Sequence, residues 1–431
     1  MSTNNFVIGY AQERSCERSF SKAIADRLAV AGLSFSFFLS FTQYCFERSD
    51  LVRLVPFATL VSLSIFLFTL SVRENRREIL TAVFRPGNIA LIAAVCVPSL
   101  ISSLYRQTSY PFQYGVAMLI LLFAVRALLS EIGPAGLLRA YLYGTTAGMF
   151  LVVALSLTDL ANSIGSTRYA PLFYDPNRIA FFAVTAIPVQ LWMATSKSHR
   201  RFVLLGTALC LIVMAAASSR GSIGALIISS AVASSLYLGK RWMRRPFVFS
   251  RAKLIAILGL LCIATVGIGA KLSAVDDAGG YILKKLAIED RERGVLDSGF
   301  TGRTGFWHIV MTTLPKTPWM FGNGYRTSEE DFNFAVDNGY LASVYELGAV
   351  ATVLIVAKFA FSCYELASAY KRLGPGAAGI ALTLVFTLIA FFANGFVHRV
   401  LFGYGDPASI LALFVFLGTR RDLDNLAAFA A

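Results

Sequence analysis

The residues best placed to do chemistry are arginines that stand alone beside apolar segments. Arg220 lies in the stretch MAAASSRGSIGALI, between two apolar runs and among small residues. A lone cation next to hydrocarbon is costly unless it faces water, a charged partner or a ligand. The small neighbours let a ligand approach the backbone, so Arg220 is a candidate anion site. A snorkelling or helix-capping arginine is the alternative.

Other segments carry arginines of the same kind. In GFTGRTGFWHIVMTTL, apolar residues recur at helical spacing, which places Arg303 near the amino-terminal end of an amphipathic helix, an end that favours anions. In STRYAPLFYDPNRIAFF, the sequence Asp175–Asn177 predicts a turn that starts a helix. The alternative for Arg303 is a solvated loop arginine. The alternative for the second segment is a turn with aromatic residues that anchor at the membrane interface. These segments and FVHRVLFGYG contribute the candidate binding residues Tyr169, Asn177, Arg178, Trp307 and Arg399.

The elements that position these arginines are predicted to be membrane-spanning helices. Of the 431 residues, 56% are hydrophobic and only 15% are charged, whereas soluble domains are about a quarter charged. Runs of roughly 17 to 22 apolar residues recur, each long enough to cross a bilayer. Lipid offers no partner for backbone amides, so each run should be helical. The sequence predicts an all-α polytopic membrane protein and excludes a soluble multidomain protein.

The distribution of basic residues predicts the orientation of about twelve spans. Basic clusters precede the first span and follow the second, sixth, eighth, tenth and twelfth, which places both termini in the cytoplasm. The excess of Lys and Arg in cytoplasmic loops also accounts for the net charge of +14. We therefore expect no nucleic acid as a partner. The first run follows a basic leader without an obvious cleavage site and is expected to be retained. The expected spans are residues 28–46, 54–72, 87–104, 113–130, 136–157, 178–195, 202–217, 222–238, 253–270, 339–360, 377–397 and 406–419.

One long polar loop lies on the non-cytoplasmic side in this arrangement, between helices 9 and 10. Loops of this length are usually functional, and this one contains the amphipathic helix with Arg303. The candidate arginines therefore share one membrane face. The expected segments are a cytoplasmic tail at 1–27, helices 1–9 at 28–270, the long loop at 271–338, helices 10–12 at 339–419 and a cytoplasmic tail at 420–431.

The sequence gives no sign of a metal or cofactor. The six cysteines lie in or beside apolar runs or in the amino-terminal tail, without the paired spacing of a zinc site or a disulfide framework. The three histidines, His199, His308 and His398, are scattered along the chain. We therefore expect no metal and no cofactor.

The stretches SSRGS, LFYDPNRIA and FTGRTGFWHIV…WMFGNGYR…FAVDNGYLASVYELG occur in an order that resembles the O-antigen ligase and O-antigen polymerase superfamily, which includes Wzy-type and exopolysaccharide polymerases. The resemblance covers most of residues 160–350. It implies an inner-membrane protein of bacteria with a periplasmic active site and metal-independent, inverting glycosyl transfer. The implied partners are a polyprenyl-pyrophosphate-linked glycan donor, a glycan acceptor, membrane lipid and a chain-length regulator.

In that chemistry an acceptor hydroxyl attacks the anomeric carbon and polyprenyl pyrophosphate leaves. Fixed guanidinium groups can stabilise the charge that grows on the leaving group, so Arg220 and Arg303 are the expected catalytic arginines, with Arg178 third. Family members often have a histidine where this chain has Asp337, before Asn338. Asp337 is the expected base if its surroundings tune its pKa. A helix N-cap is the alternative role, and the two roles can coexist.

Further residues beside these positions are expected to contact substrate. Tyr340 and Trp307 can stack on sugar faces, as can Tyr325, and core or interfacial packing is the alternative for each. Asn338 joins them as a substrate-binding candidate. Glu346 is expected to be a buried packing or hydrogen-bonded group, because helical geometry turns it away from Asp337.

The leading interpretation is a polymerase that joins lipid-linked repeat units into an exopolysaccharide or O-antigen. A ligase that transfers glycan to a lipid A core uses the same chemistry, and the departure at Asp337 mildly favours the polymerase. A transporter of polysaccharide or lipid-linked glycan is the alternative from another class. Transporters tend to place polar sites at the membrane midplane, whereas these charges gather at one face. The exception is Arg126, which is expected to snorkel to a cytoplasmic end.

We predict that Arg220→Ala and Arg303→Ala each abolish polymer formation while the protein still inserts, because the leaving group loses a fixed cation. Replacement by lysine should also fail substantially, since the planar fork of donors is lost. Polymer on gels and protein in isolated membranes measure the two effects. Normal polymer in both alanine variants would contradict the role of these arginines.

Overall fold

A computed structural model describes most of the chain. The described residues are 26–43, 50–70, 73–107, 109–163, 169, 172, 175–194, 200–244, 303–325, 327–332, 336, 338–396, 406–418 and 422. Helices are the regular structure of these residues, and no strand occurs among them. The fold is therefore consistent with the predicted all-α class. The expected ninth span, 253–270, and most of the long loop lie outside the described residues.

The helices follow the apolar runs of the sequence. A helix over residues 26–42 comes first. It is followed by α2 (Asp50–Leu70), α3 (Arg73–Val83), α4 (Pro86–Arg106), α5 (Tyr110–Leu155), α6 (Leu157–Ser163), α7 (Pro176–Met193), α8 (Arg200–Ala217), α9 (Arg220–Arg244), α13 (Arg303–Thr313), the 3₁₀ helix η2 (Leu314–Lys316), α14 (Thr327–Phe332), α15 (Gly339–Glu346), α16 (Ala349–Arg372), α17 (Pro375–Asn394) and α18 (Pro407–Leu417).

Several of these helices are suited to a bilayer. Among the described residues, six helices are long and apolar enough to cross a membrane, and two apolar helices are shorter. One of the six, α5, contains Gly133 with φ 64° and ψ 175°, followed by Pro134. An unbroken helix of its 46 residues would be about 69 Å long, more than twice the hydrocarbon thickness of about 30 Å. The break at Gly133 therefore divides α5 into two segments of membrane length.

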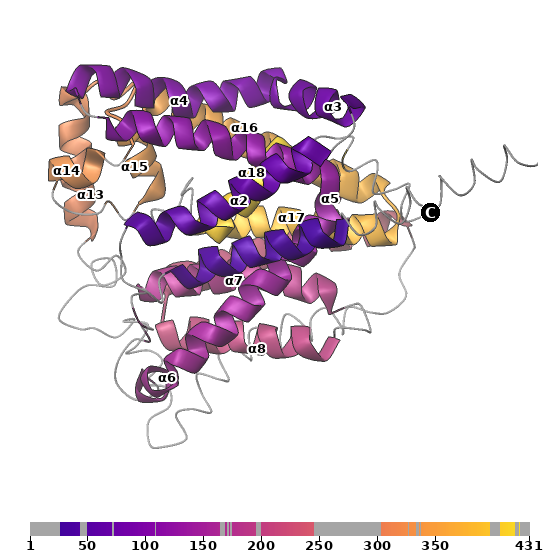
Figure 1. Cartoon of the computed structure of the whole chain (residues 1–431). Coiled ribbons are helices and arrows are strands. Elements are labelled where there is room, and N and C mark those ends of the chain that lie inside the picture. Colours follow the sequence, from indigo (N-terminus) through magenta and orange to yellow (C-terminus); the bar gives the residue numbers. More distant parts are fainter. Residues whose placement is uncertain are drawn as a thin grey trace, which may run out of the picture.

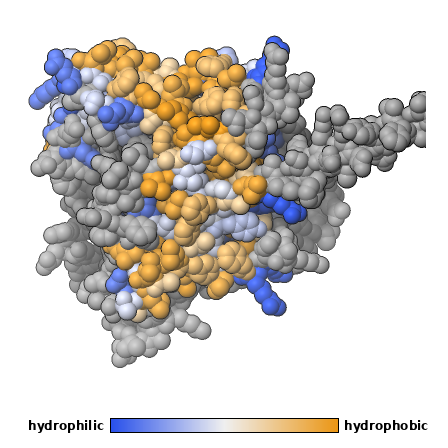
Figure 2. All heavy atoms as spheres, viewed as in Figure 1, coloured by the Kyte–Doolittle hydropathy of each residue, from blue (hydrophilic) through white to orange (hydrophobic). Residues whose placement is uncertain are grey.

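The long helices pack side by side as a bundle, with the short helices at its ends (Figure 1). Helix α7 packs on α8, α9 packs on α17, and α4 packs on both α5 and α16. The helices α13, α14 and α15 lie together at one end of the bundle, and α3 lies at the other (Figure 1). Figure 2 shows a broad hydrophobic band across the visible face, with hydrophilic residues at its two edges. This pattern is the one expected of helices that cross a membrane.

Helix α7 lies in the core of the bundle. Every residue from Ile179 to Gln190 is buried. Its polar side chains have partners on neighbouring helices: Gln190 Nε2 donates to Thr146 Oγ1 at 3.1 Å, and the Thr185 and Tyr141 hydroxyls are 3.0 Å apart. Buried polar groups in a membrane protein are stabilised by such interhelical hydrogen bonds. The core of the bundle is thus apolar with a few paired polar groups.

The range expected as one span, 339–360, is divided in the structure. Helix α15 ends at Glu346, and α16 begins at Ala349. Gly348 between them has φ 92° and lies against the backbone of Gly322, which has φ 85°. Both glycines adopt a conformation that side chains disfavour, and neither has room for a Cβ. The sequence does not predict this break between the helices, because the residues on both sides of Gly348 are apolar.

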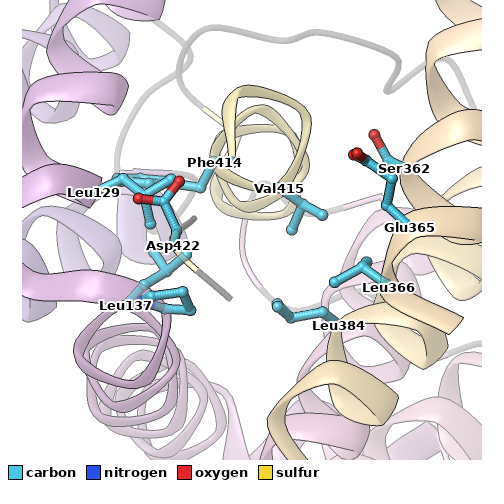
Figure 3. A pocket seen from close by; sticks show the side chains of 11 residues that line it. Leu129, Leu137, Ser362, Glu365, Leu366, Leu384, Phe414, Val415 and Asp422 are labelled. Carbon is cyan, nitrogen blue, oxygen red and sulfur yellow. The ribbon is translucent and has the colours of Figure 1, made fainter. Parts of the chain in front are cut away.

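A buried ion pair lies at the opposite end of the bundle from α15. Arg126 on α5 donates to both carboxylate oxygens of Asp422, at 2.8 and 3.3 Å. Arg126 is only 5% exposed, so the expectation that it snorkels to the surface is wrong, and its charge is balanced by Asp422 instead. Figure 3 shows the pocket beside this pair, between α5, α16 and α18. Its volume of about 30 Å³ is too small for a lipid-linked sugar.

The second half of α5 approaches the first helix closely. A Cβ on Gly144 would lie 2.6 Å from Phe37 Cβ and would collide with the carbonyl oxygen of Ser34. We predict that Gly144→Ala destabilises the protein by about 1–3 kcal/mol, the usual cost of overpacking. Unfolding in detergent, followed by fluorescence or calorimetry, measures the change.

Gly239 on α9 is the matched control, because nothing lies within 4 Å of a Cβ at that position. Gly239→Ala should leave the melting temperature unchanged or raise it, since alanine favours a helix. Equal melting temperatures for the Gly144 and Gly239 variants would contradict the close approach.

Candidate functional site

The SSRGS turn joins α8 to α9. Helix α8 ends at Ala217, Ser218 has a positive φ of 49°, and Arg220 is the first residue of α9. Ser219 accepts a hydrogen bond at its carbonyl from the Ile223 amide, at 3.0 Å. The Ser219 hydroxyl donates to that of Ser222 at 3.2 Å, and both serines are buried. The turn is therefore fixed by its own serines, and it places Arg220 at a helix end that favours anions.

Three helix ends are joined at this turn. The Ser222 hydroxyl donates to Oδ1 of Asn394, the last residue of α17, at 3.4 Å. The next residue, Gly395, accepts at its carbonyl from the Gly339 amide at 2.8 Å. The Tyr340 hydroxyl donates to the Phe392 carbonyl, also at 2.8 Å. The start of α9, the end of α17 and the start of α15 consequently form one connected unit, which we call the junction.

Helix α15 is capped by Asn338. Its Oδ1 accepts hydrogen bonds from the amides of Tyr340 and Leu341, both at 3.0 Å. The capping role considered for Asp337 thus belongs to its neighbour. Asp337 itself lies outside the described residues, immediately before the cap. The amide oxygen of Asn338, a predicted substrate-binding group, is engaged in the cap.

Arg303 is the first residue of α13, so a helix lies where the sequence predicted one. This helix packs on α15 through an apolar cluster of Val310, Leu314, Val336, Ala342 and Tyr345. Trp307, on the same helix, is half-buried. The helix that begins at Arg303 is therefore attached to the helix that begins beside Asn338, and through it to the junction.

The segment at the start of α7 supplies a further basic residue. Asp175 caps α7, accepting from the Asn177 amide at 2.7 Å, and Pro176 is the first helical residue, as predicted for this turn. Arg178 is half-buried in the first turn and interacts electrostatically with Asp406. Asp406 is buried and caps α18, accepting from the Ser409 amide at 2.9 Å. Sequence analysis overlooked Asp406, although an Asp before Pro is a signal of a helix start.

Two of the predicted aromatic residues have structural contacts. Tyr169 is fully buried, and its amide donates to the Ala216 carbonyl at 3.1 Å. Its hydroxyl lies 2.7 Å from that of Ser156. The Tyr340 ring packs 4.6 Å from that of Phe396. Tyr169 thus connects the end of α5, through its hydroxyl, with the end of α8, through its backbone amide, and the Tyr340 side chain packs at the start of α15.

A third tyrosine from the sequence analysis is also packed. The ring of Tyr325 stacks on that of Tyr114, with 3.3 Å between the centroids and an interplanar angle of 7°. This contact attaches the loop between η2 and α14 to the first half of α5. Tyr325 therefore has a packing contact in the structure, which was the alternative to stacking on a sugar.

The structure thus connects the helices that begin at Arg220, at Arg303 and beside Asn338. The side chains of Arg220 and Arg303, and all of Asp337 and Arg399, lie outside the described residues. Among the residues that are described, no group of three or more His, Cys, Asp or Glu side chains could hold a metal ion.

A second unpredicted feature, which we call the anchor, joins α4 to α14. Arg106 donates to both oxygens of the Asp331 carboxylate, at 3.0 and 2.7 Å, and the Tyr345 hydroxyl donates to the same group at 2.6 Å. Glu346 is buried and accepts from the Ser328 hydroxyl at 2.5 Å, which confirms the expectation of a hydrogen-bonded group. The anchor holds the short helices of the bundle end against the end of α4.

The electrostatics of the anchor favour the charged form of Asp331. Burial alone would raise the pKa of its carboxyl. The hydrogen bonds from Arg106 and Tyr345, and the charge of Arg106, instead hold this pKa below its ordinary value of 3.8. The anchor is therefore fully formed at neutral pH.

The fold and the junction together define a polytopic helical membrane protein with a polar site at one end of its bundle. Residues 205–356 match the family model described as O-antigen ligase. This segment, which runs from α8 into α16 and contains the junction's α9 and α15, is the part of the chain that is similar to the O-antigen ligase family. The resemblance seen in the sequence motifs is thereby confirmed. No curated protein sequence matches the chain.

We predict that Asp331→Asn lowers the melting temperature at pH 6–7 and has a diminishing effect as the pH falls below about 4. The pKa of Asp331 is lowered in the folded protein, so its contribution to stability is present above the unfolded-state pKa and is lost on acidification. The melting temperatures of both proteins across this pH range measure the effect. Asp159→Asn, at an exposed position in α6, is the control, and an equal effect of both substitutions would contradict the anchor.

Proposed function

We propose that this protein is a polymerase that joins polyprenyl-pyrophosphate-linked oligosaccharide repeat units into an exopolysaccharide or O-antigen. The proposal rests on the superfamily match and on one structural observation. The helices that begin at Arg220, at Arg303 and beside Asp337 are joined to one another through the junction and the apolar cluster. This connection between the helices supports a site to which Arg220, Arg303 and Asp337 all contribute.

The reaction is a displacement at the anomeric carbon of the donor glycan. An oxygen of the acceptor glycan forms a new bond to this carbon, while the bond to the pyrophosphate oxygen breaks and its electrons leave with the polyprenyl pyrophosphate. Asp337 takes the proton of the attacking hydroxyl. Attack from the side opposite the leaving group inverts the configuration of the anomeric carbon.

The leaving group gains negative charge in the transition state. In this proposal Arg220 and Arg303 donate hydrogen bonds to the pyrophosphate oxygens and stabilise that charge, which is the role a metal ion has in other transferases. No metal and no cofactor are then required. Arg178, held beside Asp406, and Arg399 extend the basic surface, and Asn177, Tyr169, Trp307, Asn338 and Tyr340 shape the surrounding substrate site.

The proposed setting is the bacterial inner membrane. With both termini in the cytoplasm, the junction and the anchor lie at the periplasmic face, where lipid-linked repeat units and a chain-length regulator meet the enzyme. Membrane lipid surrounds the bundle. Because Arg126 is paired with Asp422 at the opposite end, its charge gives no support to a transport pathway.

A ligase is the second candidate, and the family description favours it. A ligase uses the same bond chemistry, with a lipid A core as the acceptor in place of another lipid-linked glycan. The junction and the arginines would serve both enzymes equally. The acceptor therefore distinguishes the two functions.

We predict that the purified protein, reconstituted in liposomes with a lipid-linked repeat unit alone, produces a ladder of longer glycans and releases polyprenyl pyrophosphate. EDTA should leave the rate unchanged, because arginines provide the positive charge at the leaving group. Gel electrophoresis of the glycans and chromatography of the released lipid measure the two products.

A product that forms only when a lipid A core is added, with one repeat unit joined to the core and no ladder, would assign the protein to the ligases. Complete loss of product with EDTA would contradict the metal-independent mechanism. In cells, loss of long chains with single repeat units still attached to the core indicates a polymerase, whereas free lipid-linked long polymer indicates a ligase.

A further inference from the structure

The last residue of α17, Asn394, is buried beside the SSRGS turn. Its side chain is only 1% exposed, and it lies against the first turn of α9. Its Nδ2 group is buried and has no hydrogen-bond partner within the described part of the chain. A buried donor without a partner costs about 1–3 kcal/mol. Such a group in a folded protein needs an explanation, and a ligand is one.

The hydrogen bonds around Asn394 define the direction in which its amide points. The Ser219 hydroxyl donates to Ser222, whose own proton is therefore directed to Asn394 Oδ1. With Oδ1 engaged as an acceptor, both N–H bonds of the Asn394 amide remain available as donors. The serines of the SSRGS turn thus orient this amide beside the helix end that begins with Arg220.

Other buried asparagines of this protein are paired differently. Nδ2 of Asn88 donates to the Ala82 carbonyl at 2.8 Å, and that of Asn323 donates to the Tyr345 carbonyl at 3.0 Å. Each of these side chains stabilises a turn of the backbone. The amide of Asn394 has no such role, because its nitrogen bonds to no backbone group of the described residues.

We propose that Asn394 is a substrate-binding residue whose Nδ2 donates a hydrogen bond to a pyrophosphate oxygen of the lipid-linked donor. This inference rests on the proposed function. The start of α9, a helix of 25 residues, offers amide groups and a positive dipole end that favour an anion. Asn394 adds a neutral donor beside that end, in contact with Ser222. The pyrophosphate would therefore be held between α9 and α17, two helices that pack along their length.

Binding of farnesyl pyrophosphate to the full-length protein in nanodiscs tests this inference, with farnesol and inorganic pyrophosphate as controls for the two parts of the ligand. The wild-type protein should be stabilised against heat by farnesyl pyrophosphate more than by farnesol. Asn394→Asp keeps the size and Oδ1 of the side chain but removes both donors. It should weaken binding about tenfold or more, the effect of losing a hydrogen bond to a charged group.

Asn88→Ala is the matched control. Without ligand it should lower the melting temperature, because it breaks a hydrogen bond to the backbone, while its affinity for farnesyl pyrophosphate stays unchanged. Asn394→Ala should show the reverse pattern: it loses the long bond from Ser222 but also removes a buried unpaired donor, so its melting temperature should fall less than that of Asn88→Ala, while its binding is weak. This second variant keeps the test valid if the new carboxylate in Asn394→Asp impairs folding.

The possible outcomes separate this inference from the proposed function. Unchanged affinity in Asn394→Ala, with binding lost in Arg220→Ala, would overturn the role of Asn394 and leave the proposed function intact. A loss of stability in Asn394→Ala as large as that in Asn88→Ala would assign Asn394 to structure and also overturn it. If farnesyl pyrophosphate stabilises the wild-type protein no more than farnesol does, both the site and the inference fail.

Discussion

A charge in hydrocarbon must find a partner or reach the membrane surface, and this constraint orders the polar groups of the described helices. At one end of the bundle, Arg126 is balanced by Asp422, and Lys240 donates to the Leu373 carbonyl at 2.9 Å, near the end of α16. At the other end lie the SSRGS turn, the Asn338 cap and the anchor. Between the two ends, Thr185 and Gln190 of α7 form hydrogen bonds to neighbouring helices. The polar chemistry of the protein is consequently concentrated where the helices begin and end.

The junction shows how a site can be assembled from helix ends in such a protein. Helix ends carry amide and carbonyl groups without partners inside the helix, and here they are satisfied across elements: Gly339 donates to Gly395, and Tyr340 donates to Phe392. The bond between Ser222 and Asn394 in the same junction links residues that are 172 positions apart in the chain. Rigid helices determine where each end lies, and the backbone at these ends therefore has a defined position.

The sequence predicted those features that depend on local patterns. Apolar runs predicted the helices, the spacing of Phe306, Trp307 and Val310 predicted α13, and the Asp175–Asn177 turn predicted the start of α7. The break at Gly348, the anchor and the position of Asn394 depend on contacts between distant segments, which one sequence does not reveal. The cap of α15 fell one residue from the expected position, because Asp337 and Asn338 are both good caps. Asp406 preceded a proline as a cap does, but its burial and its interaction with Arg178 follow only from the packing of α7 against α18.

The contact between Gly322 and Gly348 has a consequence for how proteins of this kind can diverge. Both glycines have positive φ, and the backbone of each occupies the space that a side chain on the other would need. Neither position can therefore accept a larger residue by itself, and compensation at the second position is blocked for the same reason. Sequence change in this part of the chain would have to act on the surrounding residues, and this pair would pass unchanged from ancestor to descendant.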